Sequence, residues 1–411
     1  MEQIKTAIET MFPMNATLLG EGYDNRLEYL KHLLDLEVIE IPSGTEFSTW
    51  TVPKEWIVKD AWIKYKGKKI VDYKQNPLSL LVYSQPFQGT ITKEELLKNV
   101  YSTNDFGEID KDTVPYKTAF YDDKWGFCMS PNQVESLKDG DYEVFIDTEF
   151  KDGIMKLGVH TIKGETDKEI LLFAHLDHPY QANDNLSGVG ALLDVASRVK
   201  SKHTIKIVFC PETIGSIAYA HTQDLSKVEF VVAIDICGND APLLALKAYD
   251  KDALINHILH CALQMAGKMY KKASFRATIG SDETVFNDPD IGIPSVCLTR
   301  HPYDEYHTDQ DTPDKINYER IKETADLIIS IIDIADRNYI PVKNFKGQLM
   351  RSRYGIQSTI KQVNLNLDYL FYSIDGKRSV AELCAYYELS FNIIFDIFEK
   401  IIKDEKIKKR N

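Results

Sequence analysis

The chain has 411 residues, of which 44% are hydrophobic and 27% are charged, and its formal net charge at pH 7 is −13. A chain of this length exceeds one ordinary hydrophobic core, so we expect two or three domains. The acidic balance argues against a general nucleic-acid-binding protein.

The first part of the chain divides into a helical and a β-rich stretch. Residues 24–37 carry leucines at helical spacing and predict a helix. Residues 45–112 then alternate short apolar bursts with turns, for example around Trp56 and Trp62. We interpret 45–112 as a small inserted β-rich domain.

The middle of the chain predicts an α/β fold with a mostly parallel sheet flanked by helices. Two strands flank Lys151-Asp152-Gly153, which indicates a hairpin turn. Apolar strand runs then alternate with helical patterns, as expected for a sheet covered on both faces. The predicted strands are 142–149, 154–162, 168–174, 204–210, 228–234 and 293–298, and the predicted helices are 188–199, 215–222, 251–267 and 317–336.

The last segment, residues 346–411, has three helix-like pieces at 357–372, 380–387 and 391–403. Their order and the turns between them indicate a winged-helix domain. In the predicted recognition helix 391–403, two acids balance two lysines and there is no arginine to reach guanine. We therefore expect this domain to contact a protein or form a homo-oligomer, and not to bind nucleic acid.

Several signals are missing from the sequence. Residues 1–20 do not combine a basic region with an apolar core, as a secretory signal would, and no apolar run is long enough to cross a membrane. The six cysteines are scattered, with no Cys-x-x-Cys pair. We expect a cytoplasmic protein with buried thiols and no membrane partner.

The most informative stretch is residues 169–190, in which an apolar strand ends at a cluster of imidazoles and carboxylates. His175, Asp177 and His178 follow the strand, and Asp184 precedes a small-residue helix. Functional groups of α/β sheets gather at the carboxyl ends of strands. Nitrogen and oxygen donors without cysteine predict a metal site.

Further donors follow other predicted strands. Glu212 follows strand 204–210, Asp235 follows strand 228–234, and His307 lies beyond strand 293–298. Carboxylates at buried strand ends need nearby cations because desolvation is costly, and lysine and arginine are scarce there. Metal ions would account for all of these positions together.

At this point the sequence resembles the co-catalytic zinc aminopeptidases of the M28 type. The motifs occur in that family's order: His-x-Asp at 175–177, Ala-Asn-Asp-Asn-x-Ser-Gly at 182–188, Glu212 before Gly-Ser, Asp-x-x-Gly at 235–238, Gly-Ser-Asp at 280–282 and Tyr-His-Thr-x-x-Asp-Thr at 306–312. More closely, the chain resembles bacterial aminopeptidase-like proteins with an inserted β-rich domain and a C-terminal winged helix. These proteins are associated with polysaccharide biosynthesis.

The resemblance implies a domain plan and roles for individual residues. Residues 1–44 and 113–345 would form the zinc-exopeptidase-like α/β domain, with 45–112 inserted and 346–411 as the winged helix. Asp177 would orient the imidazole of a metal ligand, and one or two Zn²⁺ ions would bind per chain. The implied metal-binding residues are His175, Asp184 as the bridge, Glu212, Asp235 and His307.

Two positions leave alternatives open. The family carries two adjacent acids, a general base and a metal ligand, where this chain has Glu212 followed by Thr213. Glu212 is therefore either the base, which its spacing to Gly215 favours, or a ligand, and Glu283 could replace the missing acid. His178 could replace His175 as a ligand, although the His-x-Asp pairing favours His175.

We expect a metal-dependent, aminopeptidase-type amide hydrolase that acts on a small peptide or an amide-bearing metabolite. Carboxypeptidase and amino-sugar deacylase activities stay open, and Arg276 or Arg300 could clamp a substrate carboxylate. The alternative is a catalytically impaired binding or scaffold protein that uses the winged helix for protein contacts. A DNA-bound regulator is a third hypothesis, which the charge pattern disfavours.

Overall fold

The computed structural model describes residues 2–267, 270–356 and 361–410. An eight-stranded sheet forms its centre, in the strand order β1-β10-β12-β11-β13-β16-β14-β15, which ends with the short strands β14 (Leu244–Leu246) and β15 (Lys271–Ala273). Four neighbouring strands of this sheet are parallel: β12 (Thr204–Cys210), β11 (Glu169–His175), β13 (Val228–Ile234) and β16 (Ser295–Thr299). Their carboxyl ends therefore meet at one edge of the sheet.

Helices cover both faces of this sheet, and the side chains of β11 show how the two faces are built. Ile170 and Leu172 pack into the core that contains α1 (Glu2–Met11), α5 (Gly188–Arg198), α7 (Leu254–Ala266) and α9 (Tyr318–Arg337). Leu171 and Phe173 pack into the opposite core with α6 (Ile214–Thr222) and α8 (Glu283–Phe286). Successive strand residues point to opposite faces, so a strand buried on both sides must be apolar throughout.

The predicted α/β class is confirmed, and several predicted elements match closely. The strands predicted at 204–210 and 228–234 have the bounds of β12 and β13. The helix predicted at 24–37 is shorter, since α2 spans Glu21–Lys31. Helix α1 was not predicted, although Ile4, Ile8 and Met11 give it a buried apolar face.

A second sheet of four strands has the order β5-β4-β9-β6. Strands β4 (Glu55–Tyr65), β5 (Lys68–Asp72) and β6 (Phe87–Thr92) lie within residues 45–112, whereas β9 (Asp141–Lys151) lies beyond them. The hairpin predicted around residues 151–153 is wrong. β9 pairs with β4 and β6, while β10 (Ile154–Ile162) pairs with β1 (Leu36–Pro42) and β12 in the large sheet.

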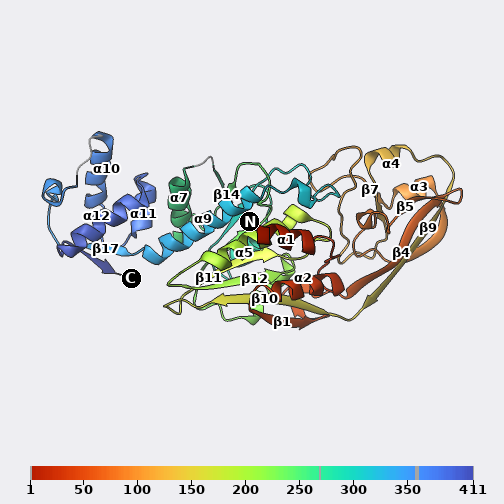
Figure 1. Cartoon of the computed structure of the whole chain (residues 1–411), viewed down its shortest axis with the longest axis horizontal. Helices are drawn as coiled ribbons and strands as arrows, with labels where there is room; N and C mark the ends of the chain where they lie inside the picture. Colours follow the sequence, from red (N-terminus) through yellow and green to blue (C-terminus); the bar gives the residue numbers. More distant parts are fainter. Residues whose placement is uncertain (1, 268–269, 357–360, 411) are drawn as a thin grey trace.

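The C-terminal segment lies at one end of the molecule and the four-stranded sheet at the other, with the large sheet between them (Figure 1). The segment contains α10 (Lys361–Tyr372), α11 (Val380–Tyr386) and α12 (Phe391–Lys403). Residues 357–360 of the helix predicted at 357–372 lie outside the described residues. Strand β17 (Ile340–Lys343), just before this segment, pairs antiparallel with β18 (Ile407–Arg410) at its end. The pairing brings the two ends of the segment close together. The winged-helix assignment, the domain boundaries and the predicted protein contacts stay predictions.

No helix in the described ranges combines the length and the apolar character needed to cross a lipid bilayer.

Candidate metal centre

The predicted site residues follow the carboxyl ends of the four parallel strands. His175 ends β11, Glu212 lies two residues beyond β12, and Asp235 comes directly after β13. His307 lies in the loop that follows β16. Because these strands are neighbours, residues far apart in the sequence meet at one edge of the sheet.

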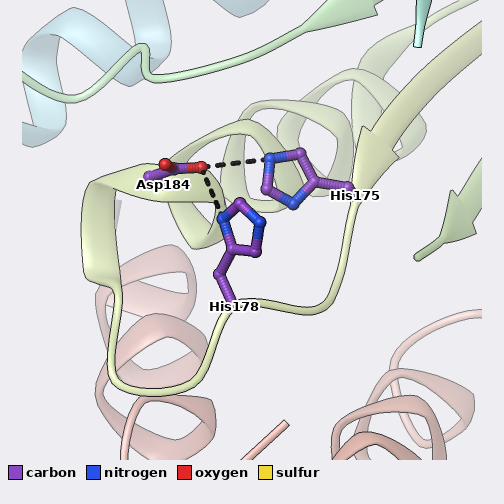
Figure 2. A group of neighbouring side chains, drawn as sticks. All are labelled: His175, His178 and Asp184. Atoms are coloured by element: carbon purple, nitrogen blue, oxygen red, sulfur yellow. Dashed lines mark hydrogen bonds and ion pairs between the residues drawn. The ribbon is translucent and has the colours of Figure 1, made fainter. Parts of the chain in front are cut away.

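Both histidines after β11 point at Asp184, the residue for which the resemblance implies a bridging role (Figure 2). Nε2 of His175 lies 3.1 Å from Oδ1 of Asp184, and Nδ1 of His178 lies 3.2 Å from the same oxygen. His178 has a φ of 70°, a backbone conformation that is costly for a non-glycine residue. The alternatives His175 and His178 are therefore brought into the cluster together.

The remaining predicted ligands surround this group. Oδ1 of Asp235 lies 3.4 Å from Nε2 of His175, and Nε2 of His307 lies 3.1 Å from Oδ2 of Asp184. Oε2 of Glu212 lies 3.4 Å from Nε2 of His178. The structure thus brings all five predicted metal-binding residues together and adds His178 to them.

The donor atoms of this cluster fit a bound cation. Two groups have ligand atoms within 4.8 Å of one another: His175, His178 and Asp184, and His175, Glu212 and Asp235. In the described part of the chain, Oδ1 of Asp235 and Nε2 of both His175 and His307 are buried without a hydrogen-bond partner. Buried polar atoms without partners are costly, and a divalent ion held by nitrogen and oxygen donors would satisfy them.

The pKa values of the cluster show how strongly its charges interact. Burial alone would raise the pKa of Asp184, but His178, His175 and His307 hold it well below its ordinary value. Burial and the nearby charge of Asp184 raise the pKa of Asp235 to about 6. The raised pKa of Asp235 reflects burial and the neighbouring negative charge of Asp184, which a bound cation would offset.

A buried arginine from α2 holds the loop that carries His175 and His178. Nη1 of Arg26 donates to the carbonyl oxygens of Leu176, Asp177 and His178 at 2.8, 3.1 and 3.2 Å. Its other nitrogens donate to the carbonyl oxygens of Met11 and Met14. Arg26 therefore fixes the backbone of residues 176–178 to the N-terminal region, a role that was not predicted.

A buried aspartate holds the loop that carries Asp184. Oδ1 of Asp311 accepts a hydrogen bond from the backbone N–H of Asn183 at 2.7 Å, and Oδ2 accepts one from that of Asp184 at 3.0 Å. The hydroxyl of Tyr303 also donates to Asp311. Asp311 belongs to the motif at 306–312, but its supporting role was not predicted.

The turn that presents Glu212 is held by two further acids. Oδ1 of Asp177 accepts from the backbone N–H of Glu212 at 2.9 Å and lies 3.2 Å from Nδ1 of His175. Asp282 accepts from the backbone N–H of Thr213 at 3.0 Å and from the hydroxyl of Ser216 at 2.7 Å. Asp177 thus lies beside Nδ1 of His175, and it also fixes the turn of the next strand.

Glu283, considered as a substitute for the missing acid, is fully buried in α8, and its Oε2 accepts from the backbone N–H of Ser281. Burial raises its pKa to about 8. Among the described residues, the groups of closely spaced donors do not include it. Its Oε1 is buried without a hydrogen-bond partner in the described structure, and its Oε2 is engaged by the backbone, so the structure does not bring Glu283 into the cluster.

The β-rich segment also reaches the site. Oδ2 of Asp105 lies 2.5 Å from Nδ1 of His307, and Nδ2 of Asn104 donates to the carbonyl oxygen of Tyr306 at 2.9 Å. Asp105 belongs to no motif, so only the three-dimensional structure reveals it.

The fold is similar to that of known aminopeptidases. Over 81% of this chain, the fold is similar to that of a zinc aminopeptidase from Bacillus subtilis, with a TM-score of 0.62, 16% identity and 94% of that chain covered. A peptidase M28 precursor from Shewanella amazonensis matches over 81% of this chain and 93% of its own, with a TM-score of 0.58 and 15% identity. The chain therefore has an aminopeptidase-like α/β fold.

The chain belongs to the family described as "Domain of unknown function (DUF4910)", whose model matches residues 5–338. A Clostridium acetobutylicum relative, "Putative polysaccharide biosynthesis protein with aminopeptidase-like domain", is 35% identical over 82% of this chain and 78% of its own length. The crystal structure of a "putative peptidase" from the same species covers 100% of this chain and 96% of its own, at 30% identity and a TM-score of 0.83.

Proposed function

We propose that this chain is a zinc-dependent, aminopeptidase-type hydrolase that cleaves an amide bond in a small peptide or an amide-bearing metabolite. The observation that carries the proposal is the convergence of His175 and His307 on Asp184, with Asp235 beside His175 and with buried donor atoms that lack hydrogen-bond partners in the described structure.

The two oxygens of Asp184 support a site for two ions. Oδ1 faces His175, which also faces Asp235, and Oδ2 faces His307. We assign His175 and Asp235 to one ion, His307 to the other, and Asp184 to both. Zinc suits imidazole and carboxylate ligands, and a bound pair of zinc ions would supply Lewis acidity at the substrate carbonyl and lower the pKa of bound water.

We assign Glu212 as the general base because its carboxylate is the most open of the clustered acids. Its side chain is 26% exposed, against 2% for Asp184 and 6% for Asp235. Burial alone would raise the pKa of Glu212, but His178 and His175 lower it, so the carboxylate is ionised at neutral pH. An ionised, accessible carboxylate is able to accept a proton from a nucleophilic water.

His178 supports this assignment of Glu212. Its imidazole lies between Asp184 and Glu212, at 3.2 Å from the first and 3.4 Å from the second. Thr213 stands where the related family has a metal-binding acid. We propose that a ring nitrogen of His178 takes the place of that acid as a metal ligand, which leaves Glu212 free to act as the base.

An aminopeptidase fits better than a carboxypeptidase. Arg300, one of the two arginines considered as a carboxylate clamp, is buried and donates to the carbonyl oxygen of Ala241 and to Glu323. A guanidinium engaged in this way is not available to a substrate carboxylate. The surplus of acids at the site suits the free amino group of a peptide.

The name of the Clostridium acetobutylicum relative supports a role in polysaccharide biosynthesis, which we propose as the cellular context.

The test combines zinc analysis with matched substrates. Elemental analysis of the untagged protein should give up to two zinc ions per chain, and Asp184→Ala should lose both. A panel of aminoacyl-coumarin amides should be cleaved when the amino group is free and not when it is acetylated. Cleavage of N-acetylated amino sugars alone would replace the aminopeptidase with a deacylase. A chain that takes up no zinc would refute the proposal.

A further inference from the structure

The loop that carries His307 lies along residues 104–117. The backbone N–H of Tyr116 donates to the carbonyl oxygen of His307 at 2.8 Å, and the backbone N–H of Asp309 donates to the carbonyl oxygen of Val114 at 2.9 Å. Oδ1 of Asp309 accepts from the backbone N–H of Val114 at 3.1 Å. This pairing holds the two segments in register next to the metal centre.

Asp105 is fixed in place by its neighbours. Asn104 donates to the carbonyl oxygen of Tyr306, and the ring of Phe106 lies 5.2 Å from that of Tyr306. Nζ of Lys117 lies 2.5 Å from Oδ1 of Asp105, while Oδ2 faces His307. Asn104 and Phe106, which flank Asp105, thus both contact Tyr306, the neighbour of His307 in the chain. These contacts hold Asp105 in place, unlike a mobile surface acid.

The imidazole of His307 has one nitrogen toward Asp105 and the other toward Asp184. Nδ1 lies 2.5 Å from Asp105, and Nε2 lies 3.1 Å from Oδ2 of Asp184. A proton on Nδ1, donated to Asp105, leaves the lone pair of Nε2 directed at the metal site. His175 shows the same arrangement, with Nδ1 toward Asp177 and Nε2 toward Asp184.

We propose that Asp105 is a positioning residue for His307, so that the β-rich segment 45–112 completes the metal centre. The inference rests on the proposed function, because it assigns His307 to a metal ion. Asp105 fixes the tautomer and the orientation of the imidazole, and Lys117 holds the carboxylate in place. Loss of a carboxylate that orients a ligating histidine costs about 10–100-fold in metal affinity.

The test is zinc affinity, measured by competition with a chromophoric chelator on the full chain. Asp105→Asn should weaken one class of zinc site by about 10–100-fold. Glu108→Gln is the matched control, because Glu108 is an exposed acid three residues further on. It should bind zinc as the wild type does. Asp105→Glu, which keeps the carboxylate, should bind more tightly than Asp105→Asn.

The melting midpoint of the metal-free proteins separates positioning from folding. The melting midpoint of Asp105→Asn should equal that of the wild type when zinc is absent. The two midpoints should differ only when zinc is present. If the metal-free Asp105→Asn variant is destabilised, Asp105→Glu decides the matter. An affinity close to that of the wild type supports the proposal, and one no better than that of His307→Ala overturns it.

The outcomes also separate this inference from the proposed function. Equal zinc affinity in the wild type and Asp105→Asn overturns the positioning role alone. A wild-type chain that binds zinc but cleaves no amide refutes the proposed activity, while the affinity difference still supports the role of Asp105. A wild-type chain that binds no zinc refutes both.

Discussion

Nη1 of Arg26 lies 2.8 Å from the carbonyl oxygen of Leu176, which is 150 positions further along the chain. The guanidinium is fully buried, and burial lowers its pKa to about 10, so it remains charged at neutral pH. One side chain of the N-terminal region thus holds the backbone of residues 176–178, which follows directly after His175 and includes His178.

We predict that Arg26→Met destabilises the protein by about 3 kcal/mol, because it leaves several buried carbonyl oxygens without donors. The free energy of unfolding in urea measures this loss. Lys31→Met, at an exposed position of the same helix, should cost well under 1 kcal/mol, roughly the value of a surface ion pair. Similar losses in both variants would contradict a central role for Arg26.

The stability of the protein should depend on pH through His203. Nδ1 of His203 lies 2.6 Å from Asp336, and Nε2 lies 3.0 Å from Glu229. Burial alone would lower the pKa of His203, but Asp336 and Glu229 raise it from 6.5 to about 9. Because the folded pKa exceeds the unfolded one, this stabilisation is complete below the unfolded value and is lost as the pH rises through about 9.

His203→Gln should therefore lower the free energy of unfolding by about 2 kcal/mol at pH 6 and by markedly less at pH 10. Urea unfolding of the wild type and the variant at both pH values measures the difference. His32→Gln, at an exposed position of the chain, serves as the control and should change the free energy of unfolding little. A loss that is equal at both pH values would refute the ion pairs as its source.

Glu212→Gln tests whether Glu212 is a base or a ligand. The amide cannot accept a proton, so kcat on a cleaved substrate should fall by about 100–10,000-fold while the zinc content stays unchanged. Steady-state kinetics and elemental analysis of the same preparation give both quantities. Glu319→Gln, at an exposed position near the start of α9, should leave both unchanged. Loss of zinc from Glu212→Gln would make Glu212 a ligand.

The contact of α1 with α5 depends on the absence of a side chain at position 190. A Cβ atom on Gly190 would lie 2.8 Å from Cγ2 of Ile4, closer than packed side chains allow. Gly190→Ala should destabilise the protein by about 1–3 kcal/mol. Combined with Ile4→Ala, which removes the opposing methyl group, the loss measured in urea should be smaller than the sum of the two single losses. Additive losses would contradict direct contact.

Much of the central sheet could be predicted because burial on both faces forces continuous apolar runs. Strands β12 and β13 match their predicted bounds for this reason. The ends of such runs also locate the site, since a polar side chain at a buried strand end needs a partner. Glu212 and Asp235 were singled out in this way, and the structure places both beside His175 or His178.

Partner choice between distant segments could not be predicted. The bounds of β9 were found nearly correctly, but its apolar alternation does not show that β4 and β6 are its neighbours. Asp105 is a single acid in a loop, where no periodicity applies. Arg26 did leave a signal: with Tyr23 and Leu30 it falls on the buried face of α2, where an arginine must find partners.

The hold of Asp311 on Asn183 and Asp184 has a consequence for protein synthesis. The residue that secures the Asp184 loop comes 128 positions after Asn183, and β16 and the His307 loop also come late in the chain. A growing polypeptide on the ribosome would carry His175 and Asp184 long before it carries Asp311. The nascent chain would therefore lack part of the candidate metal centre until residue 311 is made, and under the proposed function metal binding would follow the synthesis of that segment.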